Sequence, residues 1–471
     1  MRSLMGMILV GLFAAAELAA QNPAEPMRER PNFVFILADD LGWGDLGCYG
    51  HPHIRTPNLD RLASQGTLFT QFYVNGSVCS PSRCAFFTGQ YPARHRIHGH
   101  YATVQQNAAR GMSQFLDPAV LNVASLLRAA GYRTAHIGKW HLGSQSGGPD
   151  PRAYGFDFVG STERGGANGP AGDPYYRAKS TALFVDEALE FIRDQPDRPF
   201  YLQLWTLVPH ATLNPTPEQM EPYQAFRPGG RNFPHASAAE IYYASVTDLD
   251  TQIGRLIREL DAMGLAEKTI IFFSSDNGPE DIHIRNAGHS GVGSAGPFRG
   301  RKRSLYEGGV RVPAILRWTG HVPAGRVDNE SVWAAVDWLP TVCRLAGVTV
   351  PDHHLLDGEP MDDVWLGQSR PRRTKLYWEW RFRIAGEPFH HSPQLAIRDG
   401  YWKLYVNPDG SRLELYDMRT DHMQWNNLAE KYPEVAQRLK EDLLAWAGTL
   451  PEGPRDPGAG KVHYGWPAAS R

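Results

Sequence analysis

The sequence predicts an α/β fold with a large doubly wound, mostly parallel sheet flanked by helices, plus a small C-terminal antiparallel sheet with a helix. Two observations support this prediction. Up to about residue 370, continuous apolar runs alternate with amphipathic segments, and continuous runs are typical of strands buried on both faces. Beyond that point, short strand-like segments are separated by Asp-Gly turns, which favour a small antiparallel sheet.

Four apolar runs are predicted to be parallel strands, and polar side chains follow each of them closely. The runs are residues 32–37, 132–137, 200–208 and 269–273. The side chains that follow are, in the same order, Asp39 and Asp40, Lys139 and His141, His210, and Asp276 and Asn277. In open α/β sheets the ligand site lies beyond the carboxyl ends of the strands. We therefore expect these side chains to lie along one rim.

The remaining elements follow from helical spacing and turn residues. Apolar side chains at helical spacing predict helices over residues 58–64, 121–130, 182–192 and 239–263. Short strands are expected at 375–380, 395–398, 402–406 and 413–416, with one last helix over 433–450. We therefore divide the chain into an α/β domain over 30–370, an α+β subdomain over 371–452 and a tail over 453–471.

The N-terminus has the layout of a secretory signal peptide over residues 1–20. Arg2 precedes an apolar run from Leu4 to Ala16, and small residues precede a cleavage position after Ala20. No other stretch approaches the roughly 20 apolar residues that span a bilayer. We therefore expect a protein without a membrane span that is secreted or periplasmic.

Composition narrows the class of protein further. The 471 residues carry a net charge of −2, which argues against nucleic acid as the main partner. Four cysteines in an exported chain of this length exclude a disulfide scaffold. Cys343 lies in an apolar run and is expected to be a small buried hydrophobic residue.

The segment from Asn75 to Gly89 contains a cysteine that is suited to chemistry. Cys79 lies just before Pro81, which is favoured in a first helical turn, so Cys79 is expected at a helix N-terminus that attracts anions. Cys79 is then either a thiolate nucleophile of low pKa or the precursor of another group. A cysteine phosphatase needs arginine six residues after the cysteine, and Ala85 stands there.

The polar groups at the rim suggest a metal and an oxyanion. Asp39, Asp40, Asp276 and Asn277 form an oxygen-only set that suits Ca²⁺ or Mg²⁺ better than zinc or copper. Cationic and imidazole side chains are expected around the same place, namely Arg83, Lys139, His141, His210 and Lys302. Together they indicate a pocket for a tetrahedral oxyanion, in which cations stabilise charge and histidines move protons.

These motifs resemble those of a known family. Cys79-Ser80-Pro81-Ser82-Arg83, followed by Thr88-Gly89, resembles the signature of type I, formylglycine-dependent sulfatases of the alkaline phosphatase superfamily. Further blocks resemble that family in the same order along the chain, at residues 32–40, 56–60, 138–143, 209–210, 275–278, 302–313, 400–404 and 415–417. The resemblance implies that a formylglycine-generating enzyme converts Cys79 to formylglycine.

The resemblance also implies a role for each site residue. Asp39, Asp40, Asp276, Asn277 and the modified Cys79 would bind one Ca²⁺. The hydrated aldehyde at Cys79 would attack sulfur, His210 with Lys302 nearby would protonate the leaving alcohol, and His141 would regenerate the aldehyde. Arg83 would hold the hydrate, while Lys139 and Lys302 would grip sulfate oxygens. Two-metal phosphatases of the superfamily place a histidine at the position of Asn277, so one metal fits this sequence better.

Three functions agree with these features. The first is a secreted sulfatase that acts on sulfated carbohydrates, or on aryl sulfates. A sugar is suggested by export and by aromatic, basic and acidic loop residues, namely His98, His100, Tyr101, His283, Arg285, His289, Glu379 and Arg381. The second is a phosphodiesterase or phosphonate monoester hydrolase of the same superfamily. The third is a non-catalytic sulfoglycan-binding protein in which Cys79 stays a thiol.

Overall fold

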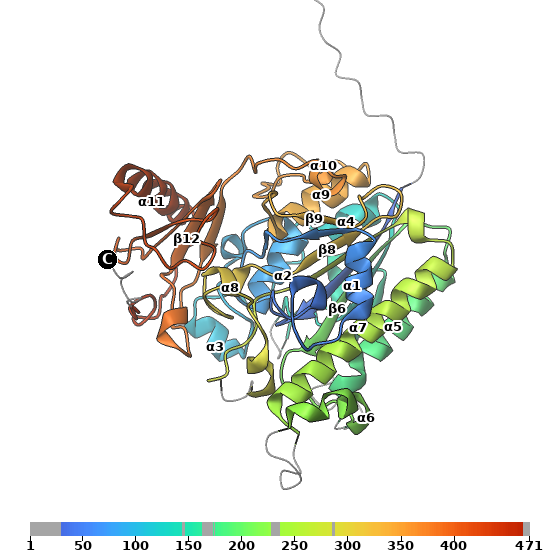
Figure 1. The fold of residues 1–471 in the computed structure, drawn as a ribbon. Coiled ribbons are helices and arrows are strands. Elements are labelled where there is room, and N and C mark those ends of the chain that lie inside the picture. The colour runs from blue at the N-terminus through green and yellow to red at the C-terminus, as the bar shows by residue number, and fades with distance from the viewer. Residues whose placement is uncertain are drawn as a thin grey trace, which may run out of the picture.

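The structure, a computed structural model, describes residues 30–143, 147–162, 173, 175–227, 236–284 and 288–464. The expected signal peptide lies outside these residues. A large sheet with helices on both sides makes up most of the molecule, and a smaller sheet with helix α11 (Pro433–Gly448) packs at one end (Figure 1). The predicted fold class is therefore confirmed.

The large sheet has eight strands in the order β5-β4-β6-β1-β7-β8-β2-β9. Their bounds are β1 Asn32–Asp39, β2 Thr67–Phe69, β4 Arg133–Gly138, β5 Phe158–Thr162, β6 Phe200–Pro209, β7 Thr269–Ser275, β8 Ala314–Arg317 and β9 Arg326–Asp328. Only β8 runs antiparallel to its neighbours in this sheet. A separate short pair joins β3 (Phe72–Tyr73) and β10 (Trp333–Ala334). The four predicted strands correspond to β1, β4, β6 and β7.

Helices cover both faces of this sheet, as its unbroken apolar strands predict. In β1, Val34 and Ile36 pack in a core that also contains α1 (Pro57–Ser64), α5 (Tyr176–Asp194) and α7 (Ala238–Ala262). Phe33 and Phe35 point the other way, into a core with α2 (Cys79–Thr88), α4 (Val123–Ala129) and α9 (Trp338–Leu345). Alternate residues of one strand thus belong to opposite layers, as the two-residue period of a strand requires.

The C-terminal part contains an antiparallel sheet in the order β11-β12-β13-β14. These strands are β11 Leu376–Glu379, β12 Leu395–Asp399, β13 Trp402–Val406 and β14 Glu414–Asp417. Leu439 and Leu443 of α11 are fully buried in the same core as this sheet. The remaining short helices are α3 Val104–Ala109, α6 Pro217–Met220, α8 Glu307–Val310 and α10 Asp362–Trp365.

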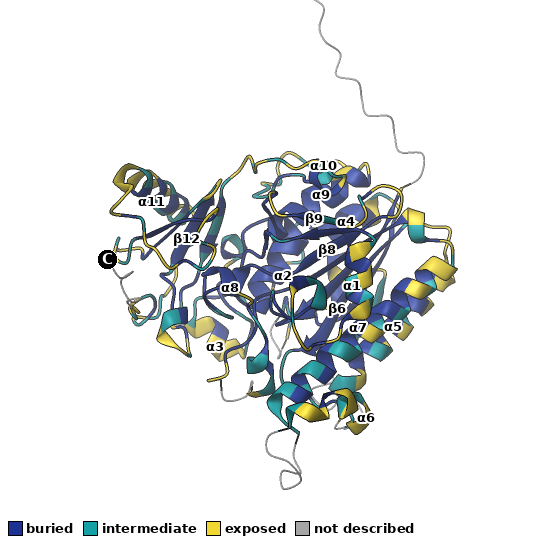
Figure 2. Ribbon diagram, in the orientation of Figure 1, coloured by how far each residue is buried: buried dark blue, intermediate teal, exposed yellow. Residues whose placement is uncertain are grey.

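Helix α2 differs from the surface helices because all ten of its residues are buried. Figure 2 shows the contrast with α5 and α7, which keep an exposed face. A helix enclosed in this way holds its first residue, Cys79, in a fixed position. All four cysteines are free, and Cys343 lies in the core as predicted. None of the helices in the described ranges is long and apolar enough to cross a membrane.

Candidate active site

The carboxyl ends of four neighbouring strands bring the expected side chains to one rim. β1 pairs with β7 in parallel, with Ala38 beside Ser275, so Asp39 and Asp40 lie next to Asp276 and Asn277. β4 and β6 end beside them and supply the other expected rim groups, Lys139, His141 and His210. A pocket of about 180 Å³ opens here and is lined by Asp40, Cys79, His100, His141, His210, Ala211, Glu280, Ile284, Lys302 and Arg303.

Cys79 lies at the centre of this rim. Its Sγ is 3.5 Å from Oδ1 of Asp39, and ligand atoms of Asp39, Asp40, Cys79 and His210 all lie within 4.8 Å of one another. Burial raises the pKa of the Cys79 thiol to about 12. The helix N-terminus therefore does not produce a thiolate, which argues against the first interpretation of this cysteine.

Buried cations neutralise the carboxylates. Nζ of Lys139 is 2.7 Å from Oδ2 of Asp39, and Nζ of Lys302 is 2.6 Å from both carboxylate oxygens of Asp40. Burial would lower the pKa of Lys302, but the charge of Asp40 raises it above the ordinary value. Both ammonium groups stay charged, because, against the effect of burial, the neighbouring carboxylate raises the pKa of each lysine. Lys302 lines the pocket beside Cys79 and can bind a tetrahedral anion there, whereas Lys139 does not line it.

Arg83 is fully buried one helical turn after Cys79. Its Nη2 and Nε lie 2.6 and 3.0 Å from Oδ2 of Asp276, and its Nη1 donates to the carbonyl oxygen of Lys139. Its guanidinium carbon lies 5.2 Å from the ring centroid of Trp205. Asp276 follows β7, Lys139 follows β4 and Trp205 lies within β6, so Arg83 links α2 to three strands of the sheet.

The donor set suits a hard cation. Nδ2 of Asn277 donates to Asp40 at 2.7 Å, whereas its buried Oδ1 has no hydrogen-bond partner within the described part of the chain. A buried acceptor without a partner is costly, and a metal ion would satisfy it. Carboxylate and amide oxygens are the ligands that Ca²⁺ takes. The residues present therefore fit a calcium ion.

Two of the three histidines that line the pocket, His141 and His210, are the expected proton-transfer groups, and both are neutral at neutral pH. Burial lowers the pKa of His210 to about 3 and holds the pKa of His141 well below its ordinary value, with Lys139 adding to the effect at His141. His210 has Nδ1 2.6 Å from the carbonyl oxygen of Ala211, and His141 has Nε2 3.0 Å from that of Tyr101. Carbonyls only accept, so these two nitrogens carry the protons. The other nitrogen of each ring is therefore the basic one.

The expected sugar-contacting residues separate into two groups. His100 lines the pocket. His98 does not, because it is buried and its Nδ1 lies 2.9 Å from Oε1 of Glu379. His283 is exposed and pairs with Asp281 and Glu387 outside the pocket. The other expected residues also do not line it: Tyr101 and Arg381 are buried, and Glu379 and His289 are half-buried, whereas Arg285 lies outside the described residues.

Two charged residues in the pocket were not predicted from the sequence. Glu280 is buried, and its Oε2 lies 3.0 Å from Nη2 of Arg303 and 3.5 Å from Nζ of Lys302. Arg303 has a φ of 77°, and Asp40 and His141 also have left-handed backbones. Such conformations are uncommon for residues other than glycine and cluster at functional sites. Only the proximity of Glu280 to Asp276 and Asn277 along the chain could have indicated it.

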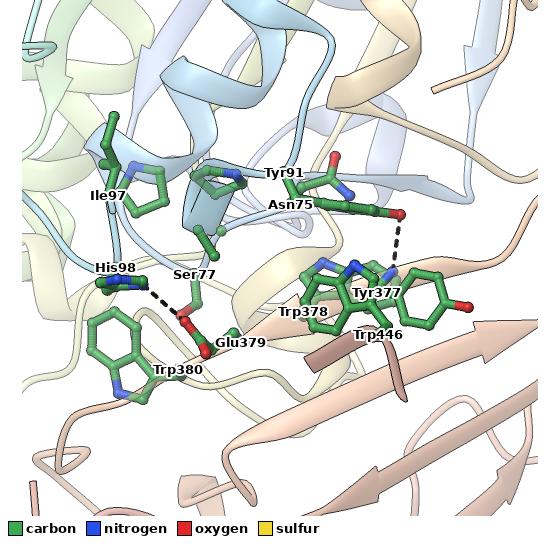
Figure 3. A pocket seen from close by; sticks show the side chains of 14 residues that line it. Asn75, Ser77, Tyr91, Ile97, His98, Tyr377, Trp378, Glu379, Trp380 and Trp446 are labelled. Carbon is green, nitrogen blue, oxygen red and sulfur yellow. Dashed lines mark hydrogen bonds and ion pairs between the residues drawn. The ribbon is translucent and has the colours of Figure 1, made fainter. Parts of the chain in front are cut away.

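A second cavity, lined by other residues, lies between the segment before Cys79 and β11 (Figure 3). Its volume is about 10 Å³, which is room for a single water molecule. Nδ2 of Asn75, Oγ of Ser77 and Nε2 of His98 are buried around it without partners among the described residues. A buried water molecule would satisfy such groups, so this cavity is structural and too small for a substrate.

Comparison with known proteins agrees with this geometry. The family model described as Sulfatase matches residues 31–348, and the one described as N-sulphoglucosamine sulphohydrolase, C-terminal, matches residues 296–448. Arylsulfatase A of Homo sapiens is 33% identical over 493 residues, which cover 91% of this chain and 89% of the relative. N-acetylgalactosamine-6-sulfatase of Canis lupus familiaris is 34% identical over 407 residues, which cover 79% of this chain and 72% of the relative.

Among solved structures, that of Ps i-CgsB in complex with k-i-k-neocarrahexaose aligns with a TM-score of 0.74 and 25% identity, covering 89% of this chain and 93% of that one. The chain belongs to the sulfatase family of the alkaline phosphatase superfamily. It is accordingly an enzyme that hydrolyses sulfuric esters.

Proposed function

We propose that this sulfatase is exported and hydrolyses sulfate esters of glycans with a formylglycine made from Cys79 and one Ca²⁺. The observation that carries the proposal is the position of Cys79, whose Sγ lies 3.5 Å from Asp39 at the buried start of α2. Modified Cys79 would hold the ion with four oxygen ligands, Asp39, Asp40, Asp276 and Asn277. The ion would supply charge stabilisation, and the formylglycine hydrate would supply the nucleophile.

The residues of the chain divide the remaining work between binding and proton transfer. Lys139 and Lys302 would bind sulfate oxygens, and Arg83, at the buried start of α2, would help to hold the modified Cys79 in place. His210 donates a proton to the leaving alcohol. Because burial lowers the pKa of His210 to about 3, it needs the negative charge of the sulfate ester to hold that proton. His141, which is neutral, takes up a proton as a base through Nδ1.

A glycan substrate is supported by the relatives rather than by the pocket alone. One relative is named for the sulfate of N-acetylgalactosamine, and one solved structure holds a neocarrahexaose. Export is supported by the apolar segment within residues 1–20. The domain limits proposed from the sequence, 30–370 and 371–452 with a tail over 453–471, are supported by the small sheet, whose strands all lie between Leu376 and Asp417.

Mass spectrometry of the peptide that contains Cys79 tests the modification. After co-expression with a formylglycine-generating enzyme, we expect conversion of Cys79, whereas Cys84 of the same helix stays a thiol. A Cys84→Ala variant should keep activity on 4-nitrophenyl sulfate, and Cys79→Ala should lose it. An unmodified Cys79 in an active enzyme would contradict the proposal.

The reaction is tested by comparing an aryl sulfate with an aryl phosphate diester. We expect faster turnover of the sulfate ester, because Asn277 stands where the two-metal phosphatases of the superfamily have histidine. Faster turnover of the diester would instead favour a phosphodiesterase or phosphonate monoester hydrolase.

A further inference from the structure

One guanidinium group near the pocket has no carboxylate partner among the described residues. Arg110 follows α3 and is half-buried. Its Nη1 donates to the carbonyl oxygen of His100 at 3.3 Å, and its guanidinium carbon lies 5.4 Å from the ring centroid of Phe382. In the part of the chain that the structure describes, no aspartate or glutamate lies within ion-pair distance of it. The carbonyl of His100 and the ring of Phe382 position this side chain but do not neutralise its charge.

The contact with His100 places Arg110 at the edge of the active site. The backbone that accepts from Arg110 carries the imidazole that lines the pocket. The charge of Arg110 also acts on this imidazole. Burial is the main cause of the lowered pKa of His100, and the charge of Arg110 is the second, ahead of the charges of Lys302 and Arg303. Arg110 therefore contacts a residue that lines the pocket without lining the pocket itself.

The other cations at this edge already have partners. Lys302 pairs with Asp40, and Arg303 pairs with Glu280 through Nη2 at 3.0 Å. Burial lowers the pKa of Arg110, and the charge of Arg303 lowers it further, so these two arginines repel each other. The edge of the pocket therefore carries a positive charge that an anionic ligand would neutralise.

We propose that Arg110 binds a second anionic group of the substrate, a carboxylate or a second sulfate, next to the sulfate ester that is cleaved. This assignment rests on the proposed function, because it places the cleaved ester above Cys79. A guanidinium offers a planar pair of donors that matches a carboxylate or a sulfate. The ring of Phe382, which belongs to the C-terminal part of the chain, limits the orientations that the guanidinium of Arg110 can take. The preferred substrates are then sugars that carry two acidic groups close together.

Binding of small sulfonates tests this without turnover. We suggest sulfobenzoates and benzenedisulfonates as charged probes, with 1,3 and 1,4 substitution, and the matching sulfobenzamides as neutral ones. Calorimetric titration of the converted, Ca²⁺-loaded enzyme should give at least tenfold tighter binding for one charged probe than for its amide. Comparing the affinities of the sulfobenzoates and the benzenedisulfonates shows whether a carboxylate or a second sulfate is the preferred second group. Arg110→Met should abolish the difference, and Arg110→Lys should keep part of it.

Arg383→Met is the matched control. Arg383 follows Phe382 in the chain, is exposed and has Asp456 as a partner at 3.9 Å. Its loss removes a nearby charge but should leave the preference for charged probes intact. The assignment is overturned if charged probes bind no more tightly than amides, or if Arg110→Met weakens both classes equally. Because the sulfonates are not hydrolysed, failure of the proposed chemistry would instead be recognised from an unmodified Cys79 or from the absence of aryl sulfate turnover.

Discussion

Nζ of Lys302 lies 2.6 Å from both carboxylate oxygens of Asp40 and 3.5 Å from Oε2 of Glu280. The side chain is 4% exposed, so these two acids take the place of water around the ammonium group. A cation held between two fixed anions is positioned before the substrate arrives, which is the arrangement that stabilises developing charge most effectively.

We predict that Lys302→Met lowers kcat on 4-nitrophenyl sulfate by about 10²-fold to 10³-fold, the loss that follows removal of one preorganised donor. The variant also leaves Asp40 without its main counter-ion, so its thermal unfolding should be measured beside its kinetics. Lys375→Met, which removes a half-buried pair with Asp442, serves as the control. A near-normal kcat in a folded Lys302→Met enzyme would exclude contact between Lys302 and the sulfate.

Glu280 is predicted to act through its two cationic neighbours. Burial would raise the pKa of Glu280, but the charges of Lys302 and Arg303 lower it to about 2, so it is ionised whenever the enzyme works. Glu280→Gln keeps the shape and loses the charge that holds both cations. We expect kcat to fall about 10-fold to 100-fold, as for other residues that position the groups in contact with the substrate, with a smaller change in KM. Glu387→Gln, at an exposed pair with His283, should leave both constants unchanged.

Asn277 is predicted to contribute to metal affinity through Oδ1, the buried oxygen that has no partner in the described ranges. Ca²⁺ at 100 times its Kd stabilises a protein by about 2.7 kcal/mol, so addition of Ca²⁺ after chelation should raise the Tm of the normal enzyme. Asn277→Leu should remove most of this rise, whereas the exposed control Asn426→Ala should keep it. An unchanged response to Ca²⁺ in Asn277→Leu would mean that the ion does not bind this oxygen.

The fold could be predicted from the sequence because the central strands are buried on both faces. β1 and β7 are therefore apolar without interruption, and Asp39 and Asp276 are conspicuous where the apolar runs end. The strands at one edge of the sheet were harder to predict from the sequence. β2, β8 and β9 have only three or four residues each, and β8 reverses direction, so no periodic pattern distinguishes them from loops.

The loops around the pocket could not be predicted in the same way. His98 and His100 are two residues apart and chemically identical, yet one is buried against Glu379 and the other lines the pocket. Which of them turns inward depends on packing against the C-terminal sheet, which no local pattern records. The same applies to Arg110, whose position is set by Phe382, a residue 272 positions later in the chain.

Glu379 connects the small sheet to the segment that leads into the pocket, and its ionisation should contribute to stability. Its Oε1 accepts from His98 at 2.9 Å and from Arg381 at 2.7 Å, and its Oε2 accepts from Arg455 at 2.9 Å. Burial would raise the pKa of Glu379, but the hydrogen bond and charge of His98, followed by Arg381, lower it to about 2 from an ordinary value of 4.5. The folded protein therefore favours the ionised carboxylate.

The sign of the pH dependence follows from this shift. Between pH 4.5 and pH 2 the unfolded chain binds a proton that the folded Glu379 does not, so the contribution of this group is complete above pH 4.5 and is lost as the pH falls toward 2. The shift corresponds to about 3 kcal/mol. In urea unfolding, Glu379→Gln should lower the free energy of unfolding by that order at pH 7 and by progressively less toward pH 3. The exposed control Glu452→Gln should have little effect at either pH. A deficit in Glu379→Gln that stays constant across this range would mean that Glu379 stabilises the fold by shape rather than by charge.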